Sequence, residues 1–129
     1  MLDACCLIAF FNQEKGFEVV ERILSEENEV YISIVNVFEI CYDLERSNPE
    51  VNGTDIYEDI LELPIQIEDK IDKIHLQHSI YFKNKYRISV ADAFALGLAK
   101  KVNAKIVTAD HHEFDLIDIN ENLQFEWIR

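Results

Sequence analysis

Apolar residues recur along the chain in short blocks, and the spacing within these blocks alternates between helical and strand-like. Helical spacing and helix-start signals predict helices over Ala4–Asn12, Gly16–Ser25, Ser33 to about Arg46, Asp55–Leu63, Asp69–Asn84 and Val90–Val102, with a brief helical turn at Phe114–Ile117. Short apolar runs predict a strand ending at Asp3 and further strands at Val30–Ile32, Ile65–Ile67, Lys105–Thr108 and Gln124–Ile128. Strands separated by helices indicate an α/β protein whose mainly parallel sheet is covered on both faces.

Local signals support several of these boundaries. Ser33 and Ser89 are suitable N-caps for the helices that follow them. Along the helix predicted at 69–84, Ile71, Ile74 and His78 recur on one stripe.

Length and composition are those of a single domain covering residues 1–129. The one break, Arg46–Thr54, is too short to separate two domains. No apolar run approaches the roughly 20 residues that a membrane-spanning helix needs, and the N-terminus lacks the basic segment of a secretory signal. The three cysteines, Cys5, Cys6 and Cys41, have no zinc-site spacing and are interpreted as reduced thiols, which favours a cytoplasmic protein.

The net charge of -13 argues against non-specific binding to nucleic acid. The charge is unevenly distributed, however. Residues 1–69 carry 3 basic and 17 acidic side chains, whereas residues 70–105 carry 8 basic and 2 acidic ones. A basic zone within an acidic chain leaves room for a local contact with a polyanion.

Four carboxylates, Asp3, Glu39, Asp92 and Asp110, stand against or within apolar segments, with no Lys or Arg within three positions of any of them. An ionised carboxylate in such a place is costly unless something compensates its charge. Asp3 and Asp110 follow predicted strands, and Glu39 and Asp92 fall early in helices that can pack beside the same sheet edge, where ligands of parallel sheets bind. We therefore expect one shared site for Mg²⁺ or Mn²⁺, since hard cations prefer oxygen ligands.

Each acid also has a purely structural interpretation. Asp3 could cap a helix, Asp92 could stabilise a helix start, and Asp110 could be an ordinary turn residue. Glu39 could be a solvated helix position. For each acid taken singly, except Asp92, the structural interpretation is favoured. For the four acids taken together, a shared metal site is favoured.

Other polar residues near these four acids are weaker candidates for the metal site. The acids Asp115 and Asp118 are interpreted as surface residues rather than peripheral metal contacts. The adjacent pair His111 and His112 is expected to face solvent, because two neighbouring side chains cannot both point into one site.

The motifs Leu2–Ala9, Val37–Ile40, Ser89–Ala93 and Val107–Asp110 together resemble those of PIN-domain nucleases, in particular the small VapC-type toxins. The resemblance covers essentially the whole chain. It implies a PIN-like three-layer α/β/α fold with a five-stranded parallel sheet. It also implies a Mg²⁺- or Mn²⁺-dependent endoribonuclease whose acidic quartet corresponds to Asp3, Glu39, Asp92 and Asp110.

The match also assigns supporting positions. Thr108 corresponds to the hydroxyl residue that often precedes the last acid by two positions. Cys5 stands where the family usually has Ser or Asn, and a thiol is a poorer hydrogen-bond partner than a hydroxyl, so we expect weaker ordering near Asp3. Only two residues precede Asp3, so the first strand is either short or continues upstream of this sequence.

A substrate surface is predicted from the basic zone. Lys83, Lys85 and Arg87 precede the helix that carries Asp92, and the aromatic residues Tyr81, Phe82 and Tyr86 are interleaved with them. Basic side chains contact phosphates and exposed aromatic rings stack on unpaired bases. Three further lysines, Lys100, Lys101 and Lys105, could extend this face, although the whole zone could also be an ordinary solvated helix surface.

The sequence thus predicts a ribonuclease of the toxin type. The resemblance implies a cognate antitoxin and a homodimer, for which the apolar stripes of Ala4–Ser25 and Val30–Arg46 could supply interfaces. Two alternatives stay open at this point. One is a non-catalytic PIN-like module that binds RNA or protein, and the other is a different acidic Mg²⁺ enzyme, such as a phosphohydrolase or a receiver-type phosphoacceptor.

Overall fold

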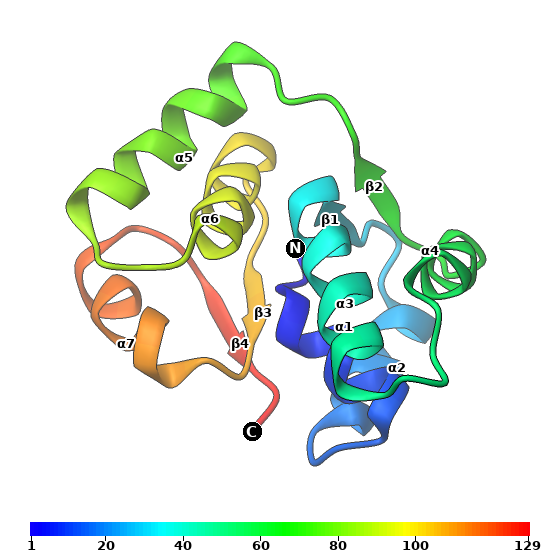
Figure 1. The fold of residues 1–129 in the computed structure, drawn as a ribbon. Helices are drawn as coiled ribbons and strands as arrows, with labels where there is room; N and C mark the ends of the chain where they lie inside the picture. Colours follow the sequence, from blue (N-terminus) through cyan, green and yellow to red (C-terminus); the bar gives the residue numbers. More distant parts are fainter.

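The computed structural model describes residues 1–129 and contains seven helices and four short strands (Figure 1). The helices are α1 (Ala4–Asn12), α2 (Phe17–Glu26), α3 (Ile34–Ser47), α4 (Gly53–Leu61), α5 (Lys73–Lys85), α6 (Val90–Val102) and α7 (His111–Asn120). The strands are β1 (Tyr31–Ser33), β2 (Gln66–Glu68), β3 (Ile106–Thr108) and β4 (Phe125–Trp127). None of the helices is both long and apolar enough to cross a lipid bilayer.

The strands pair in parallel, β1 with β2 and β3 with β4. The segment Met1–Asp3 joins the two pairs. Leu2 forms a parallel bridge with Val107 of β3, and its amide donates to the Tyr31 carbonyl oxygen of β1 at 2.8 Å. The order across the sheet is therefore β2, β1, Met1–Asp3, β3, β4. The predicted parallel arrangement is confirmed, but the first of the five segments contributes a single bridge and not a full strand.

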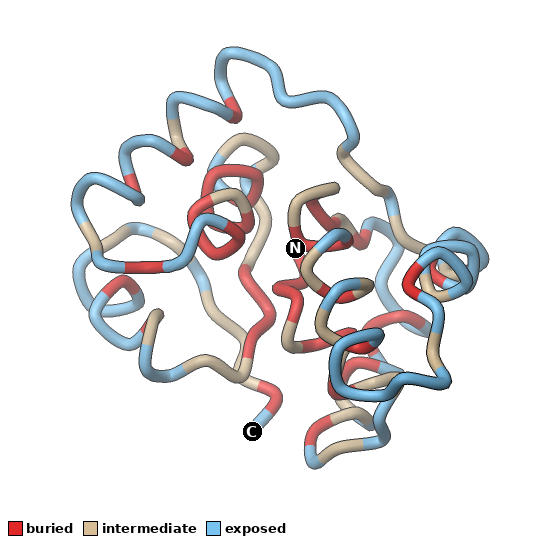
Figure 2. The backbone as a smooth tube through the Cα atoms, viewed as in Figure 1, coloured by how far each residue is buried: buried red, intermediate tan, exposed pale blue.

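Helices cover both faces of this sheet. Alternate residues of a strand point to opposite faces, and here Leu2 and Val107 belong to one hydrophobic core while Met1 and Ile106 belong to another. The first core is built mainly from α1, α2, α3 and β1, and the second from α6, α7 and β3. Figure 2 shows the buried backbone gathered around the central segments. The predicted three-layer α/β/α architecture is confirmed.

Helix α6 is the most deeply buried helix of the second layer. Ser89 caps it and Asp92 completes a capping box, as serine and an acid three residues later commonly do. Small residues let α5 approach closely, because a Cβ atom at Gly97 would lie 2.2 Å from Ser79 Oγ and 2.8 Å from its backbone nitrogen.

Two predictions about individual helices were wrong. Helix α5 begins at Lys73 and not at Asp69, and it buries His75, Ser79 and Phe82, whereas Ile71 and Ile74 are exposed. The contact with the small-residue face of α6 selects this side, so the apolar stripe is left in solvent. Helix α7 has ten residues, where only a brief turn was expected, because the Asp110 side chain caps its start.

Candidate metal and nuclease site

The four predicted acids lie around one pocket of about 230 Å³. This pocket is lined by Asp3, Ala4, Cys5, Ile8, Glu39, Asp43, Ser89, Asp92, Asp110 and Glu113. Met1–Asp3 and β3 both lead into it at their carboxyl ends, while α3 and α6 bring in the other two acids. The topology thus brings together residues that are up to 107 positions apart, as the sequence predicted.

Asp3 is held rigidly at the base of this pocket. It caps α1, its Oδ1 accepts from the Ala4 amide at 2.7 Å, and its Oδ2 accepts from Thr108 Oγ1 at 2.8 Å. The side chain is 2% exposed. Burial, followed by the neighbouring Cys5 and Asp92 groups, raises the pKa of Asp3 well above its ordinary value. A carboxyl group this deeply buried needs either a proton or a cation.

Cys5 takes over the hydrogen bonds that a hydroxyl would make at its position. Its Sγ donates to Asp3 Oδ2 at 3.2 Å and accepts from the Ala109 amide at 3.2 Å. It also lies 3.5 Å from Thr108 Oγ1. The thiol therefore keeps the carboxylate and the end of β3 linked, although each contact is weaker than one made by oxygen.

Asp92 and Asp110 are both held at helix N-termini. Asp92 lies in the first turn of α6, and its Oδ2 accepts from the Ser89 amide at 3.2 Å. Asp110 caps α7 by accepting from the Glu113 amide at 3.0 Å, and its own amide donates to Thr108 Oγ1 at 3.0 Å. Burial raises the pKa of Asp92, the hydrogen bonds from Ser89 oppose this, and the charge of Asp110 adds to it.

Glu39 projects into the pocket from α3. Burial, together with the charges of Asp92 and Asp43, raises the pKa of Glu39 to about 7. Asp43 lies one helical turn further along α3 and forms an ion pair of 3.2 Å with Arg46. None of the four predicted acids, Asp3, Glu39, Asp92 and Asp110, forms an ion pair, so these four concentrate negative charge that has no protein counter-charge in contact with it.

Sequence reasoning missed two acids of this pocket. Glu113 lines it, whereas Asp115 and Asp118, the acids considered from the sequence, are exposed. Asp43 was also missed. The signal was helical spacing, because residues three or four positions apart share a helix face. Glu113 follows Asp110 by three positions and Asp43 follows Glu39 by four.

The residues present fit a hard divalent cation in their chemistry. The walls carry six carboxylates, and one buried oxygen of Glu113 has no hydrogen-bond partner. Burial, with a further contribution from neighbouring carboxylates, raises the pKa values of Asp3, Glu39 and Asp92. No three Asp, Glu, His or Cys side chains are already drawn together around one point as metal ligands would be. The carboxylates instead line the walls of the pocket.

The three predicted phosphate-binding residues differ in their surroundings. Lys83, which is exposed, donates to the Ile88 carbonyl oxygen just before α6. Its positive charge opposes the rise in the pKa of Asp92 that burial causes. Arg87 is exposed. Lys85 is engaged by Glu121 at 2.8 Å, as part of a cluster in which the hydroxyls of Tyr81 and Tyr86 also donate to Glu121.

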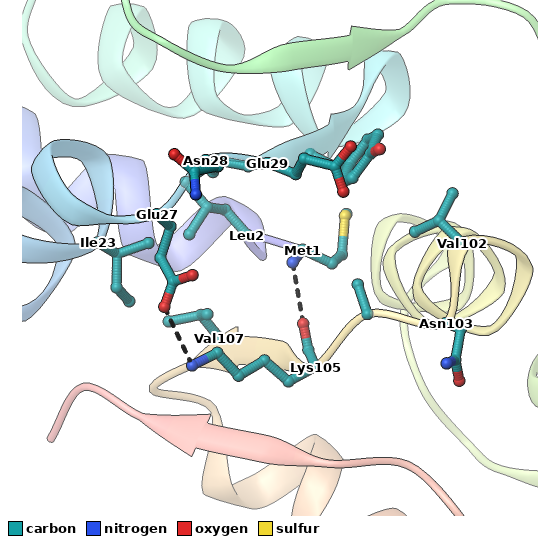
Figure 3. A pocket seen from close by; sticks show the side chains of 13 residues that line it. Met1, Leu2, Ile23, Glu27, Asn28, Glu29, Val102, Asn103, Lys105 and Val107 are labelled. Carbon is teal, nitrogen blue, oxygen red and sulfur yellow. Dashed lines mark hydrogen bonds and ion pairs between the residues drawn. The ribbon is translucent and has the colours of Figure 1, made fainter.

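Phe82, Lys101 and Lys105 do not belong to an exposed basic face. Phe82 is a core residue, and Lys101 pairs with Glu68 and Asp72. Lys105 lies beside a pocket of about 320 Å³ at the opposite edge of the sheet, where it pairs with Glu27 at 3.6 Å and its carbonyl oxygen accepts from the Met1 amino group (Figure 3). The expectation that these three residues extend or support the substrate surface was wrong.

The histidines and cysteines behave as structural residues. His111 and His112 are exposed, as predicted, and His111 stacks on Trp127 with ring centroids 4.0 Å apart. The three cysteines are free thiols, as predicted.

The three-layer fold, with its acids beyond the carboxyl ends of a parallel sheet, is the arrangement that the resemblance to PIN-domain nucleases implied. The sequence matches the PIN domain family over residues 1–120, and the chain belongs to that family. The resemblance drawn from the four motifs is therefore confirmed, and a receiver-type or other unrelated acidic fold is set aside.

Solved structures share the fold across nearly the whole chain. In the DNA-bound VapBC structure from Salmonella typhimurium, the similar chain has a TM-score of 0.73 and 21% identity, with 100% of this chain and 97% of that chain covered. In VapBC2 from Rickettsia felis bound to a promoter DNA fragment, the similar chain has a TM-score of 0.72 and 18% identity, with 98% of this chain and 96% of that chain covered. In VapBC-1 from nontypeable Haemophilus influenzae, the TM-score is 0.70 and the identity 19%, with 99% of this chain and 96% of that chain covered.

A curated relative is similar in sequence but much longer. The mannosylglucosyl-3-phosphoglycerate synthase of Petrotoga mobilis is 26% identical over 125 residues. The match covers 95% of this chain but only 23% of that protein.

Proposed function

We propose that this protein is a divalent-metal-dependent endoribonuclease of the toxin–antitoxin type. The observation that carries the proposal is the pocket in which Asp3, Glu39, Asp92 and Asp110 meet without a compensating base. Membership of the PIN domain family and the fold shared with chains of VapBC structures support it.

The roles of the four acids follow from their positions. Mg²⁺ or Mn²⁺ bound here would lower the pKa of a water and stabilise charge on the scissile phosphate. Asp3 and Asp92, the two most buried acids, would hold this cation directly. Glu39 and Asp110 would complete its shell or orient the attacking water. Thr108 and Cys5 would fix the orientation of Asp3 through the contacts at 2.8 and 3.2 Å.

The substrate would approach over the end of α5. Lys83 and Arg87 precede the helix that carries Asp92 and are exposed, so they are suited to contact phosphates. Lys85 would contribute less, because Glu121 already neutralises it.

The test of this function is the variant Asp92→Asn, because an amide is a far weaker metal ligand than a carboxylate but can still accept the capping hydrogen bond. We expect RNA cleavage to fall by at least about a hundredfold, since even removing the supporting partner of a ligand costs 10–100-fold. Circular dichroism should show an unchanged fold. Full activity in this variant would exclude the proposed site.

An antitoxin partner is the second part of the proposal. Helices α3 and α4 enclose an apolar groove of about 380 Å³, in which Phe38 is 70% and Tyr42 is 51% exposed. Glu39 and Asp43 follow these two aromatic residues by one position, so the acidic pocket is only about 100° further around α3. A partner with an apolar helix for the groove and a basic tail for the pocket would block the site.

This groove favours one of the two apolar stripes that were predicted to supply interfaces. Of the two apolar stripes, that of Ala4–Ser25 is largely consumed by the core, whereas Val30–Arg46 presents Phe38 and Tyr42 to solvent. A pull-down from the native host should recover a small basic protein with wild type but not with Phe38→Glu, and Leu116→Glu on α7 is the matched control, since Leu116 is also exposed. Equal recovery with all three proteins would contradict the placement. The homodimer remains a prediction, which the mass of the purified protein in solution tests.

Poor ordering of Asp3 by Cys5 would favour the alternative of a non-catalytic binding module. Because its thiol still contacts Asp3 and Ala109, this residue gives no reason to expect an inactive site.

A further inference from the structure

His111, at the start of α7, is an exposed ring that its neighbours hold in one orientation. It is the first residue of the helix and follows Asp110 directly. Its Nδ1 lies 2.8 Å from Asp115 Oδ1, and its Nε2 lies 3.1 Å from the Arg129 carbonyl oxygen. Because hydrogen bonds hold two different edges of the ring, its plane is fixed although it lies at the surface.

Aromatic side chains of β4 support this ring from behind. The Trp127 ring is nearly parallel to it, with centroids 4.0 Å apart and an interplanar angle of 10°. Trp127 in turn stacks on Phe125 with centroids 5.6 Å apart, and both rings pack against the second hydrophobic core. One face of His111 is thus covered, yet its side chain is 53% exposed. The exposed surface therefore lies mainly on the opposite face of the ring.

This aromatic stack lies beside the acidic pocket. Trp127 is the register partner of Thr108 on the neighbouring strand. Thr108 Oγ1 in turn donates to Asp3 and accepts from the Asp110 amide at the base of the pocket. Since neighbouring strands are about 4.8 Å apart, the stack stands one strand away from the proposed site of cleavage.

We propose that the exposed face of His111 is a stacking platform for one unpaired base of the RNA substrate, and that it directs the adjoining phosphate toward the acidic pocket. The choice of RNA as the ligand rests on the proposed function. Unpaired bases stack on exposed aromatic rings, those of histidine included. A ring that is already fixed by its neighbours loses little freedom when a base binds. Both of its nitrogens are engaged, so the flat face is what it offers to a ligand.

A purely structural role predicts a different behaviour. His111 also ties the start of α7 to the residues that follow β4, through the Arg129 carbonyl oxygen. If this tie were its only role, the hydrogen bonds of the ring would matter and its free face would not. The two roles are therefore separable by variants that remove one property and keep the other.

The test measures binding of a labelled single-stranded RNA of mixed sequence to the purified full chain in EDTA, so that metal-dependent cleavage does not interfere. His111→Phe keeps an aromatic face and loses the hydrogen bonds, whereas His111→Gln keeps a polar group and loses the face. His112→Ala is the matched control, because it changes the neighbouring ring, which is 94% exposed. We expect His111→Gln to bind about fivefold or more weakly, and His111→Phe and His112→Ala to stay within about twofold of wild type.

Two further measurements identify the part of the RNA that is bound. The slope of log affinity against log salt should be the same for His111→Gln as for wild type, because stacking on a base releases no counterions. An abasic RNA of the same length should bind wild type and His111→Gln equally. Melting temperatures of all variants show whether each one is folded under the conditions of the assay.

The outcomes separate this proposal from the proposed function. Equal affinity of His111→Gln and wild type for the labelled RNA overturns the platform and assigns the exposed face to another partner, such as a protein. An equal loss in His111→Gln and His111→Phe, or the same loss with abasic RNA, also overturns it. No RNA binding by wild type overturns it as well. If His111→Gln alone binds weakly but wild type does not cleave RNA with Mn²⁺, the platform stands and the nuclease proposal fails.

Discussion

At the scale of single residues, helix capping and the proposed metal binding fall on the same side chains. Asp3 and Asp110 are N-caps, and Asp92 closes a capping box. The structural interpretations of Asp3 as a helix cap and of Asp92 as a stabiliser of its helix start are thus correct, whereas Asp110 caps a helix and is not an ordinary turn residue. None of these structural roles excludes the proposed functional one. Because each capping bond restricts the rotation of its carboxylate, the helix starts fix the orientation of three of the proposed ligands.

The raised pKa of Glu39 predicts how stability depends on pH. An acid whose pKa is higher in the folded than in the unfolded protein binds more protons when folded, so the free energy of unfolding falls as pH rises between the two values. For Glu39 this window extends from 4.5 to about 7, and the raised pKa values of Asp3 and Asp92 act in the same direction. Melting of the metal-free protein should therefore shift to lower temperature from pH 5 to pH 7.

The control for this prediction is the variant Glu39→Gln, which should show a shallower dependence over the same range. Excess Mn²⁺ should reduce the loss, because metal competes with protons for the carboxylates. A metal-free protein that becomes steadily more stable from pH 5 to pH 7 would contradict the account.

At the scale of secondary-structure elements, the close packing of α5 on α6 depends on Gly97. Replacing Gly97 by Ala favours a helix by about 1 kcal/mol in isolation. The added Cβ would, however, lie 2.8 Å from the Ser79 backbone nitrogen, so the helices must move apart. Overpacking of this kind costs about 1–3 kcal/mol, and we expect a net loss of stability of up to about 2 kcal/mol in urea unfolding. A more stable Gly97→Ala variant would show that this contact is not tight.

The same two helices show what could be predicted from the sequence. The bounds of α6 were predicted correctly because Ser89 and the run of small apolar residues mark both its start and its burial. The buried face of α5 could not be predicted from its apolar stripe, because it contains His75 and Ser79 rather than the isoleucines. That choice depends on the shape of α6, a tertiary effect that periodicity along one helix does not contain.

A similar limit applies to the site. Asp3, Glu39, Asp92 and Asp110 were identifiable because each stands in an apolar setting. Glu113 ends the polar stretch 110–113, where composition alone does not distinguish a pocket residue from a surface acid. It becomes recognisable only once α7 is known to start at His111.

At the scale of the whole molecule, the proposed metal site would make folding and metal binding interdependent. A ligand that binds only the folded state raises its stability according to concentration and affinity, by about 2.7 kcal/mol at one hundred times the dissociation constant. Millimolar Mn²⁺ or Mg²⁺ should thus raise the melting temperature of wild type, and Asp92→Asn should show a much smaller rise. Identical melting curves with metal and with EDTA would count against a site formed by the fold.

The uneven distribution of charge predicts where RNA binds. The double variant Lys83→Gln/Arg87→Gln should weaken RNA binding and reduce the slope of log affinity against log salt by about 0.7 for each lost single-strand phosphate contact. Lys85→Gln should have less effect because Glu121 already pairs with this lysine. Lys101→Gln, which removes a lysine paired with Glu68 and Asp72, is the control. An unchanged slope in the double variant would exclude Lys83 and Arg87 as phosphate contacts.

Cleavage of mixed total RNA and tRNA by the purified protein tests the central claim most directly, with Mn²⁺, Mg²⁺ or EDTA present and Asp92→Asn run beside wild type. The account predicts discrete products that require metal, disappear in EDTA and are absent or at least about a hundredfold reduced in the variant. Cleavage that persists in EDTA, or that proceeds equally in Asp92→Asn, would contradict it.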